Sequence, residues 1–226
     1  MYKKIFSLLC FVALSLSIFA QQDDCYEMTK LGASVRYGNY SGRSLMGYIE
    51  RTVIDVREEN GKKIVSYDWK MLNKKGKPSK AARLTGMDQW QTSVKFENGS
   101  YYLTFDFSYG GSLGKHSGYL LKIPQTLQVG DELEGGTLNH TSKYTGITFE
   151  NECTFENWKV VEEVDLNTAA GSIHCMKIQG HVSGKYQGHK LDYIGTIYLA
   201  KNIGIVCQET PIYSMKVEAS QINLGE

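Results

Sequence analysis

Hydrophobic and polar side chains alternate with a period of two along most of the chain after residue 20. In VSYDWKM, residues 65–71, every odd position is apolar and the even positions carry Ser, Asp and Lys. The same alternation runs through WQTSVKF at 90–96, YYLTFDF at 101–107 and KLDYIGTIYLA at 190–200. Successive side chains of a strand point to opposite faces, so this period predicts strands with one apolar and one polar face.

Two Asn-Gly pairs separate consecutive alternating runs. Asn98-Gly99 lies between two of the runs above, and Asn60-Gly61 lies between a long apolar-rich stretch and residues 65–71. Both residue types tolerate the positive φ that a type I′ turn requires. Each pair therefore predicts a tight β-hairpin.

The rest of the chain favours the same fold class. Only Ser79–Met87 has a pattern that could form a short helix, and the chain contains just 3 prolines against 23 glycines. These features predict an all-β fold, an antiparallel meander of about ten strands. Because open sheet edges invite aggregation, we expect the sheet to form a lipocalin-like barrel or half-barrel.

Residues 1–20 have the pattern of a secretory signal peptide. Two lysines begin it, an apolar run from Ile5 to Phe19 follows, and Ala20 precedes the polar QQDD. The run is shorter than the stretch of about 20 apolar residues that spans a membrane comfortably. We therefore expect cleavage after Ala20, leaving 21–226 as one soluble exported domain in the periplasm, the extracellular space or the cell envelope.

The charge of the chain is nearly balanced. It carries 25 Lys+Arg and 24 Asp+Glu, and loss of the two lysines at 3 and 4 leaves 25 − 2 = 23 basic residues against 24 acidic ones. A nucleic-acid-binding protein depends on many cations that neutralise phosphates. The balance argues against a dedicated nucleic-acid binder, and no motif in the sequence implies a cofactor.

Cysteine usage leaves the redox chemistry open. Cys10 lies inside the predicted signal, and the remaining cysteines are Cys25, Cys153, Cys175 and Cys207. Export permits disulfides, and four cysteines allow three complete pairings, among which the sequence does not choose. Buried thiols that act as small hydrophobes are the alternative.

Histidine and cysteine are adjacent at His174–Cys175, inside a predicted strand between Gly171 and Gly180. Neighbouring side chains of a strand diverge, so this pair cannot hold a metal together or form a nucleophile–base dyad. No histidine pair has the spacing of a helical zinc motif, and the sequence predicts no metal site. The alternative is a zinc site assembled in space from His140, His181 and His189.

Aromatic side chains on the predicted inner face are candidates to line a cavity for an apolar or glycan ligand. The candidates are Tyr67, Trp69, Trp90 and Phe105. Aromatic residues are also ordinary strand formers, and a barrel of about eight strands can be filled by its own side chains.

The glycine-rich segment SYGGSLGKHSG, residues 108–118, is a second candidate feature. It is not a phosphate loop, because Tyr109 stands in place of the first required glycine and His116 in place of Ser/Thr. We expect either a plain hairpin connection or a loop over the barrel mouth, where Tyr109, Lys115 and His116 would contact a ligand.

A basic cluster occupies the segment NKKGKPSKAAR, residues 73–83. Its cations are Lys74, Lys75, Lys77, Lys80 and Arg83. A charge run of this kind usually forms a solvated hairpin tip. The functional alternative is contact with an anionic headgroup or polysaccharide, an attraction that salt would screen.

Four segments carry a family resemblance: TAAGSIHCMKI at 168–178, YLAKNIGIVCQET at 198–210, YEMTKLGASVRY at 26–37 and LKIPQTLQVGDEL at 121–133. They resemble the TapB-like exported proteins, a group allied to a periplasmic β-rich domain family of unknown function. The chain departs from the family pattern at Ala169, Ile173 and Cys207. The resemblance covers most of residues 26–226 and implies an envelope or secreted β-protein with a lipocalin-like or half-barrel shape. It implies no reaction.

These observations favour a non-catalytic exported protein that binds an apolar or envelope-derived ligand, or a protein partner. An envelope hydrolase acting on lipid or glycan is one alternative, although no Gly-x-Ser-x-Gly elbow or defined carboxylate pair is present. A structural or adhesive surface component is the other. No catalytic residue is predicted.

Overall fold

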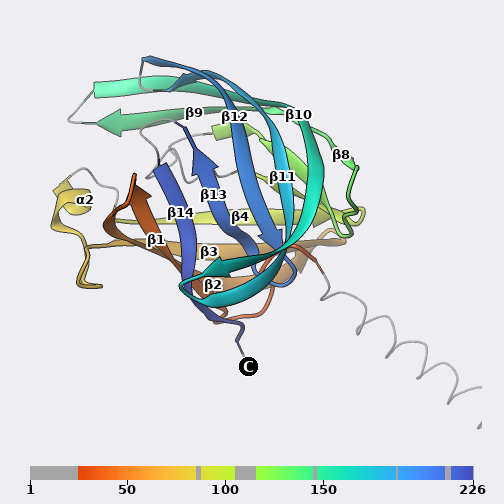
Figure 1. The fold of residues 1–226 in the computed structure, drawn as a ribbon, viewed down its shortest axis with the longest axis horizontal. Helices are drawn as coiled ribbons and strands as arrows, with labels where there is room; N and C mark the ends of the chain where they lie inside the picture. The colour runs from red at the N-terminus through yellow and green to blue at the C-terminus, as the bar shows by residue number, and fades with distance from the viewer. Residues whose placement is uncertain are drawn as a thin grey trace, which may run out of the picture.

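The computed structural model describes residues 25–84, 88–104, 116–144, 147–186, 188–211 and 215–225. Most of these described residues form one antiparallel sheet of 14 strands, which one short helix accompanies (Figure 1). The first seven strands are β1 Ser34–Ser41, β2 Ser44–Glu59, β3 Lys62–Leu72, β4 Gln89–Glu97, β5 Ser100–Leu103, β6 His116–Gly118 and β7 Leu121–Pro124. The others are β8 Glu132–Leu133, β9 Thr137–Tyr144, β10 Ile147–Thr168, β11 Gly171–Tyr186, β12 His189–Ala200, β13 Gly204–Thr210 and β14 Met215–Asn223. The helix is α2, Lys80–Leu84.

Most neighbouring strands of the sheet are also neighbours in the chain. The first and the last strand of the chain meet in the middle of the sheet. The strand order is β6-β9-β10-β11-β12-β13-β14-β1-β2-β3-β4-β5-β7, so the C-terminal strand β14 pairs with β1. The sheet is not closed, but Leu121 of β7 forms an isolated bridge to Gly135, and the adjacent β8 pairs with β10. The predicted all-β barrel or half-barrel is therefore confirmed, with several very short strands beyond the expected number.

Both predicted Asn-Gly hairpins are present. Asn60 and Asn98 have φ of 51°, and the glycines that follow them have φ of 73° and 70°. They join β2 to β3 and β4 to β5. Positive φ at both central residues defines the type I′ turn, whose backbone twist matches the right-handed twist of the flanking strands.

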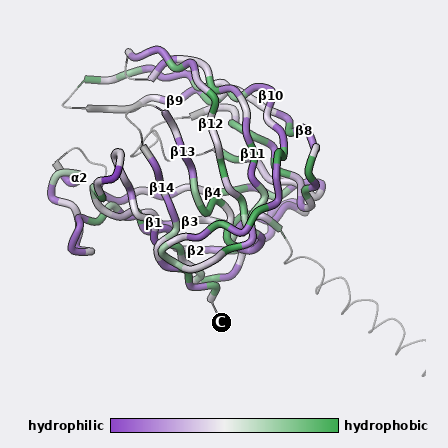
Figure 2. Tube along the Cα trace, viewed as in Figure 1, coloured by the Kyte–Doolittle hydropathy of each residue, from purple (hydrophilic) through white to green (hydrophobic). Residues whose placement is uncertain are grey.

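Alternation sorts side chains between the interior and the outside of the sheet, and Figure 2 shows hydrophilic and hydrophobic residues interspersed along its strands. In the interior, an aromatic side chain packs directly against the backbone of two glycines. Gly180 of β11 and Gly195 of β12 are directly opposed, and the indole of Trp158 lies over both. A Cβ at Gly180 would lie 2.3 Å from Trp158 Cγ, so this position requires glycine.

The segment before β1 lies in the interior over residues 25–29, whereas residues 30–32 are exposed. The hydroxyl of Tyr67 donates to the Met28 carbonyl at 2.7 Å, and the hydroxyl of Tyr101 donates to the Tyr26 carbonyl at 2.6 Å. Tyr26 and Met28 are themselves buried in the core. Because buried carbonyls need hydrogen-bond partners, these tyrosines allow an irregular segment to fill the space between strands.

Strands β10 and β11 form a long hairpin that extends beyond its neighbour β12. Pairing between β11 and β12 stops at Met176, whereas β10 and β11 stay paired as far as Gly171. In Figure 1 the distal part of this hairpin crosses near β14, which β10 contacts. Its Leu166 and Ile173 pack against the core. We call residues 161–176 the distal hairpin.

Among the described residues, no helix has the length and apolar character needed to cross a membrane.

Candidate functional site

A buried ion pair fixes the N-terminal segment inside the sheet. Glu27 Oε1 lies 2.8 Å from Arg51 Nη2, and the two side chains are only 2% and 5% exposed. The same carboxylate oxygen accepts a hydrogen bond from the Met28 amide at 2.8 Å. The Arg51 guanidinium lies over the Tyr67 ring, 3.8 Å from its centroid. This arrangement satisfies a buried charge from several sides and anchors the segment.

The surroundings of this ion pair keep its arginine charged and its tyrosines protonated. Burial has the largest single effect and opposes the charged form of Arg51, but Glu27, Tyr67 and Tyr37 together outweigh it and raise the pKa of the guanidinium. Burial raises the pKa of Tyr37 to about 12 and that of Tyr67 well above its usual value. None of these groups is poised to exchange a proton near neutral pH, so the cluster is an anchor rather than an acid–base site.

A pocket of about 640 Å³ opens between this segment and the start of the distal hairpin. We call it the rim pocket. Its apolar lining comes from Tyr26, Leu127, Ile173, Met176, Ala200 and Ile203. Its polar lining comes from Glu163, Ser172, His174, Cys175 and Lys201. The apolar side chains come from four separate parts of the chain, which explains why no single sequence motif marks the pocket.

His174, on the polar side of the rim pocket, is held between two carboxylates. Its Nδ1 lies 2.8 Å from Asp165 Oδ1 and its Nε2 lies 2.7 Å from Glu163 Oε1. Hydrogen bonding to Asp165 and then to Glu163 raises the pKa of His174 above 6.5. The ring therefore favours the imidazolium form, in which both nitrogens donate. Cys175 is buried while the His174 side chain is exposed, so the predicted divergence of this pair is confirmed.

The hydrogen bonds of His174 give a direct pH prediction. Asp165→Asn should lower the pKa of His174 toward 6.5, because it removes the partner with the largest effect. In the unmodified chain these ion pairs are complete below about pH 6.5 and are lost as pH rises through the raised pKa of His174. NMR titration of the imidazole resonances measures both values. His181, whose pKa is raised mainly by Asp192, is the internal control. Identical titration of His174 in both proteins would contradict the assignment.

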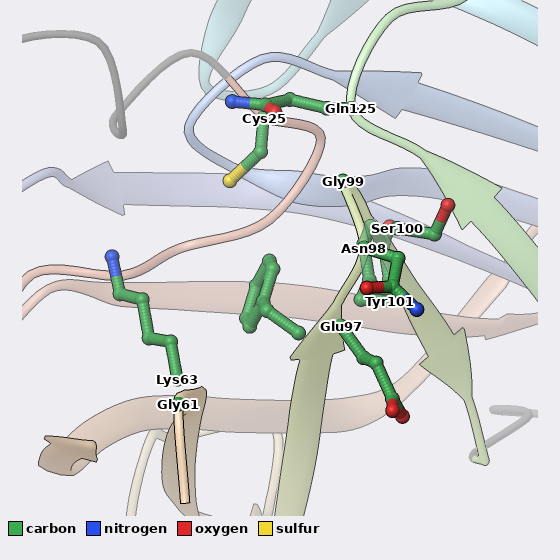
Figure 3. Close-up of a pocket in the computed structure, with 10 residues that line it drawn as sticks. Cys25, Gly61, Lys63, Glu97, Asn98, Gly99, Ser100, Tyr101 and Gln125 are labelled. Atoms are coloured by element: carbon green, nitrogen blue, oxygen red, sulfur yellow. The ribbon is translucent and has the colours of Figure 1, made fainter. Parts of the chain in front are cut away.

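A smaller pocket of about 160 Å³ lies between the two Asn-Gly hairpins (Figure 3). Figure 3 shows Cys25 and Lys63 pointing toward one another across it, with Gln125 at its upper side. Ligand pockets usually measure about 300–1,000 Å³. This cavity is too small for a ligand of that class, whereas the rim pocket falls within the range.

The structure brings three of the four predicted cavity aromatics together. The rings of Trp69 and Trp90 stack with centroids 5.6 Å apart, and Trp69 Nε1 donates to Thr92 Oγ1 at 2.8 Å. Trp69 also flanks the Arg51 guanidinium, 5.1 Å from its ring, next to Tyr67. All three aromatic side chains belong to the packed interior, whereas the rim pocket is lined by other residues.

The remaining predicted contacts fall largely outside the described residues. These are Phe105, Tyr109 and Lys115. His116 begins β6, where its backbone pairs opposite His140, but its side chain is outside the described part. The mouth-loop hypothesis therefore stays a prediction.

The four cysteines of the described residues are present as thiols, so no disulfide forms among them. Along β11, the position opposite Cys153 lies 184 − 175 = 9 residues from Cys175, on the order of 30 Å. Cys207 pairs with β12 and so lies two strand spacings of about 4.8 Å each from β11. A disulfide needs Cα atoms within about 7 Å. Cys153–Cys175 and Cys175–Cys207 bonds are therefore incompatible with this fold.

The third bond within the sheet, Cys153–Cys207, is also too long. Along β12, the positions aligned with the two cysteines lie 198 − 191 = 7 residues apart, on the order of 23 Å. Each complete pairing of four cysteines contains one of these three bonds. No complete pairing fits the fold, and a single bond that includes Cys25 stays a prediction.

The histidines proposed for a zinc site do not converge. His181 binds Asp192 at 2.9 Å on the outside of β11, His189 begins β12 and is exposed, and His140 is buried on β9. In the part of the chain that the structure describes, no group of three His, Cys, Asp or Glu side chains could hold a metal ion.

Comparisons with known proteins support the fold and give a family. A family model described as DUF3108-like matches residues 30–219. A proposed exported protein with a YmcC-like fold from Bacteroides fragilis has 16% identity and a TM-score of 0.68, over 88% of this chain and 99% of its own. A proposed lipoprotein from Parabacteroides distasonis has 11% identity and a TM-score of 0.68, over 90% and 100%. A search of curated proteins gave no match.

Proposed function

The chain belongs to the DUF3108-like family, and on that premise we propose that it is an exported protein that binds a ligand through the rim pocket. Export is supported by the signal pattern of residues 1–20 and by the exported or lipoprotein character proposed for both structural relatives. The periplasm or cell envelope is the proposed location. The narrower likeness to TapB-like proteins belongs to the same proposal.

The observation that carries this proposal is the size and lining of the rim pocket. Its volume of about 640 Å³ falls within the range of small-molecule sites, and six of its lining side chains are apolar. Tyr26 and Leu127 are buried side chains that form part of its wall. This lining favours the apolar part of a ligand, such as an acyl chain.

The polar side of the rim pocket indicates that the ligand also has a polar end. Glu163, His174 and Lys201 all line it, so a bound apolar chain would end beside charged groups. Amphipathic envelope molecules have this division between an apolar part and a polar end. An amphipathic ligand therefore fits the pocket better than a wholly apolar one.

The hydrolase alternative finds no support at this pocket. A nucleophile–histidine–carboxylate triad uses one ring nitrogen for the carboxylate and the other for the nucleophile. In His174 both nitrogens are bound to carboxylates, Asp165 and Glu163. The geometry favours binding over catalysis at this site.

In this proposal, the predicted cavity aromatics Tyr67, Trp69 and Trp90 would contact the ligand deeper in the interior. The backbone of Met28 lies against Tyr67, whose hydroxyl donates to the Met28 carbonyl. A ligand would reach the Tyr67 ring only with displacement of the buried residues 25–29.

A filling substitution at the pocket tests the proposed function. Ser172 is exposed and lines the rim pocket, so Ser172→Trp should block the pocket without disturbing the core. We expect binding of the fluorescent fatty acid 11-dansylaminoundecanoic acid to weaken roughly tenfold or more, because steric exclusion removes the buried apolar contacts. Fluorescence titration measures the affinity.

Asn167→Trp is the matched control. Asn167 is exposed and lies directly opposite Ser172 in the β10–β11 ladder, but it does not line the pocket. Its affinity should equal that of the unmodified chain. Absence of fatty-acid binding, together with native mass spectra that show only ligand-free chain from its own host, would refute the proposal.

A further inference from the structure

A groove of about 430 Å³ lies outside the sheet, away from the rim pocket, on the outer faces of β1, β2 and β14. One wall is the turn after β3, residues 73–78, which we call the lysine loop. The other wall includes Ala169 at the tip of the distal hairpin. The charged and polar side chains that line the groove are those of Arg36, Tyr48, Lys74, Lys75, Ser220 and Gln221.

The lysine loop is held in one conformation by its own hydrogen bonds. Asn73 Oδ1 accepts from the amides of Lys75 at 2.8 Å and Lys77 at 3.3 Å. The Asn73 amide donates to the Lys77 carbonyl at 2.8 Å, and Gly76 supplies the positive φ of 71° that the turn needs. The backbone that carries Lys74 and Lys75 is therefore pre-organised, which lowers the entropic cost of binding.

A β-bulge directs two polar side chains of β14 into the groove. Arg36 pairs with Gln221 and Tyr37 pairs with Ala219, so Ser220 has no opposite residue in β1. Bulges of this kind re-aim side chains. The Ser220 hydroxyl donates to the Arg36 carbonyl at 2.9 Å, and Ser220 and Gln221 both line the groove.

The groove carries a local excess of positive charge. Arg36 is paired with Glu50 at 2.6 Å, whereas Lys74 and Lys75 make no ion pair within the described residues. Two cations of the groove therefore stay uncompensated on a chain whose formal net charge is +1. A concave surface with low-dielectric walls concentrates such a field.

We infer that this groove binds an acidic oligosaccharide. The ammonium groups of Lys74 and Lys75 would meet the carboxylate or sulfate groups of the sugar. The half-buried ring of Tyr48 offers a flat apolar face to the C–H face of a pyranose ring, and the Gln221 amide can both donate to and accept from hydroxyl groups.

The groove combines two lysines with an aromatic ring and an amide, and this combination favours an acidic sugar over other polyanions. An anionic membrane is contacted by exposed cations and apolar side chains on a convex surface, whereas these residues line a recess. A simple polyanion would use the lysines but would make no use of the aromatic ring or the amide. The sugar can be free or linked to a lipid, since the groove would recognise only its glycan part.

Calorimetric titration of the full exported chain with oligogalacturonate, alginate oligomers and heparin oligosaccharide tests the inference. Fully methyl-esterified oligogalacturonate is the neutral control, polyglutamate is the control for charge alone, and phosphatidylglycerol vesicles test a membrane. We expect binding to at least one acidic glycan, weaker at high salt. We expect no comparable binding to the three controls.

Variants locate the binding in the groove. K74A/K75A should weaken binding of the acidic glycan roughly tenfold through loss of two ionic contacts. K77A/K80A is the matched control, since it removes two cations from the same region that do not line the groove. Y48F should keep the affinity and Y48A should reduce it, with circular dichroism and thermal melting reporting the fold of each variant.

Three results would overturn the inference. The first is no binding to any of the three acidic glycans. The second is equal loss of affinity in K74A/K75A and K77A/K80A, which would indicate charge alone. The third is binding of polyglutamate or vesicles as tight as that of the glycans. Failure of this inference would leave the rim pocket untouched, because the two sites share no lining residue.

Discussion

Arg51→Met is expected to lower the free energy of unfolding by about 3–5 kcal/mol, because removing one partner leaves a buried charge uncompensated. The charge left behind is Glu27, whose side chain is 2% exposed and whose carboxylate would keep only the hydrogen bond from the Met28 amide. The variant also loses the contact between the guanidinium and the Tyr67 ring. The N-terminal segment should therefore loosen first.

Urea denaturation followed by tryptophan fluorescence measures this loss. Arg36→Met is the matched control, because Arg36 of β1 also pairs with a glutamate, Glu50 of β2, but its side chain is 32% exposed. An exposed pair contributes about 0–1 kcal/mol, so the control should change little. The double variant Glu27→Leu with Arg51→Met should recover much of the loss, because it removes both buried charges. Equal effects of the two arginine substitutions would show that burial is not the cause.

Gly180→Ala is expected to destabilise the chain by about 3 kcal/mol, the upper end for overpacking a well-filled core. The added Cβ would lie 2.3 Å from Trp158 Cγ and 2.4 Å from its Cδ1. The indole cannot simply rotate away. It stacks on Phe155 with centroids 4.8 Å apart and donates from Nε1 to the His181 carbonyl at 3.3 Å.

The neighbouring glycine provides a graded control. A Cβ at Gly195 would lie 3.1 Å from the outer edge of the same indole, so Gly195→Ala should cost clearly less than Gly180→Ala. In a Trp158→Leu background the extra cost of Gly180→Ala should shrink, because the clashing ring is gone. Thermal melting of the unmodified chain, of Gly180→Ala, of Trp158→Leu and of the double variant gives the coupling free energy between the two positions. Additive effects of the two substitutions would mean that the indole is not what excludes the methyl group.

Much of the fold could be predicted because it depends on short-range rules. The period of two follows from the pleat of a strand, and the hairpins at Asn60 and Asn98 follow from residues that tolerate positive φ. The same rules predicted that the side chains of His174 and Cys175 diverge. Each of these predictions uses only neighbours in the chain, and each is confirmed.

The candidate site could not be predicted in the same way. The rim pocket joins Tyr26, Leu127, Met176 and Ile203, which have no common spacing. One signal in the sequence pointed to the buried ion pair. Arg51 lies between Ile49 and Val53 on the apolar face of its strand. An arginine in that position indicates a buried partner, but the identity of Glu27 depends on where an irregular segment runs.

By itself, the sequence determined the all-β class and the faces of the strands, because side-chain alternation and turn conformation are properties of adjacent residues. Only the tertiary structure decided that β14 pairs with β1, that residues 25–29 enter the interior, and that the distal hairpin forms one side of the rim pocket. The cysteine bonds it excludes also depend on strand register. The physical reason is that these features arise from contacts between residues far apart in the chain, which no local period encodes.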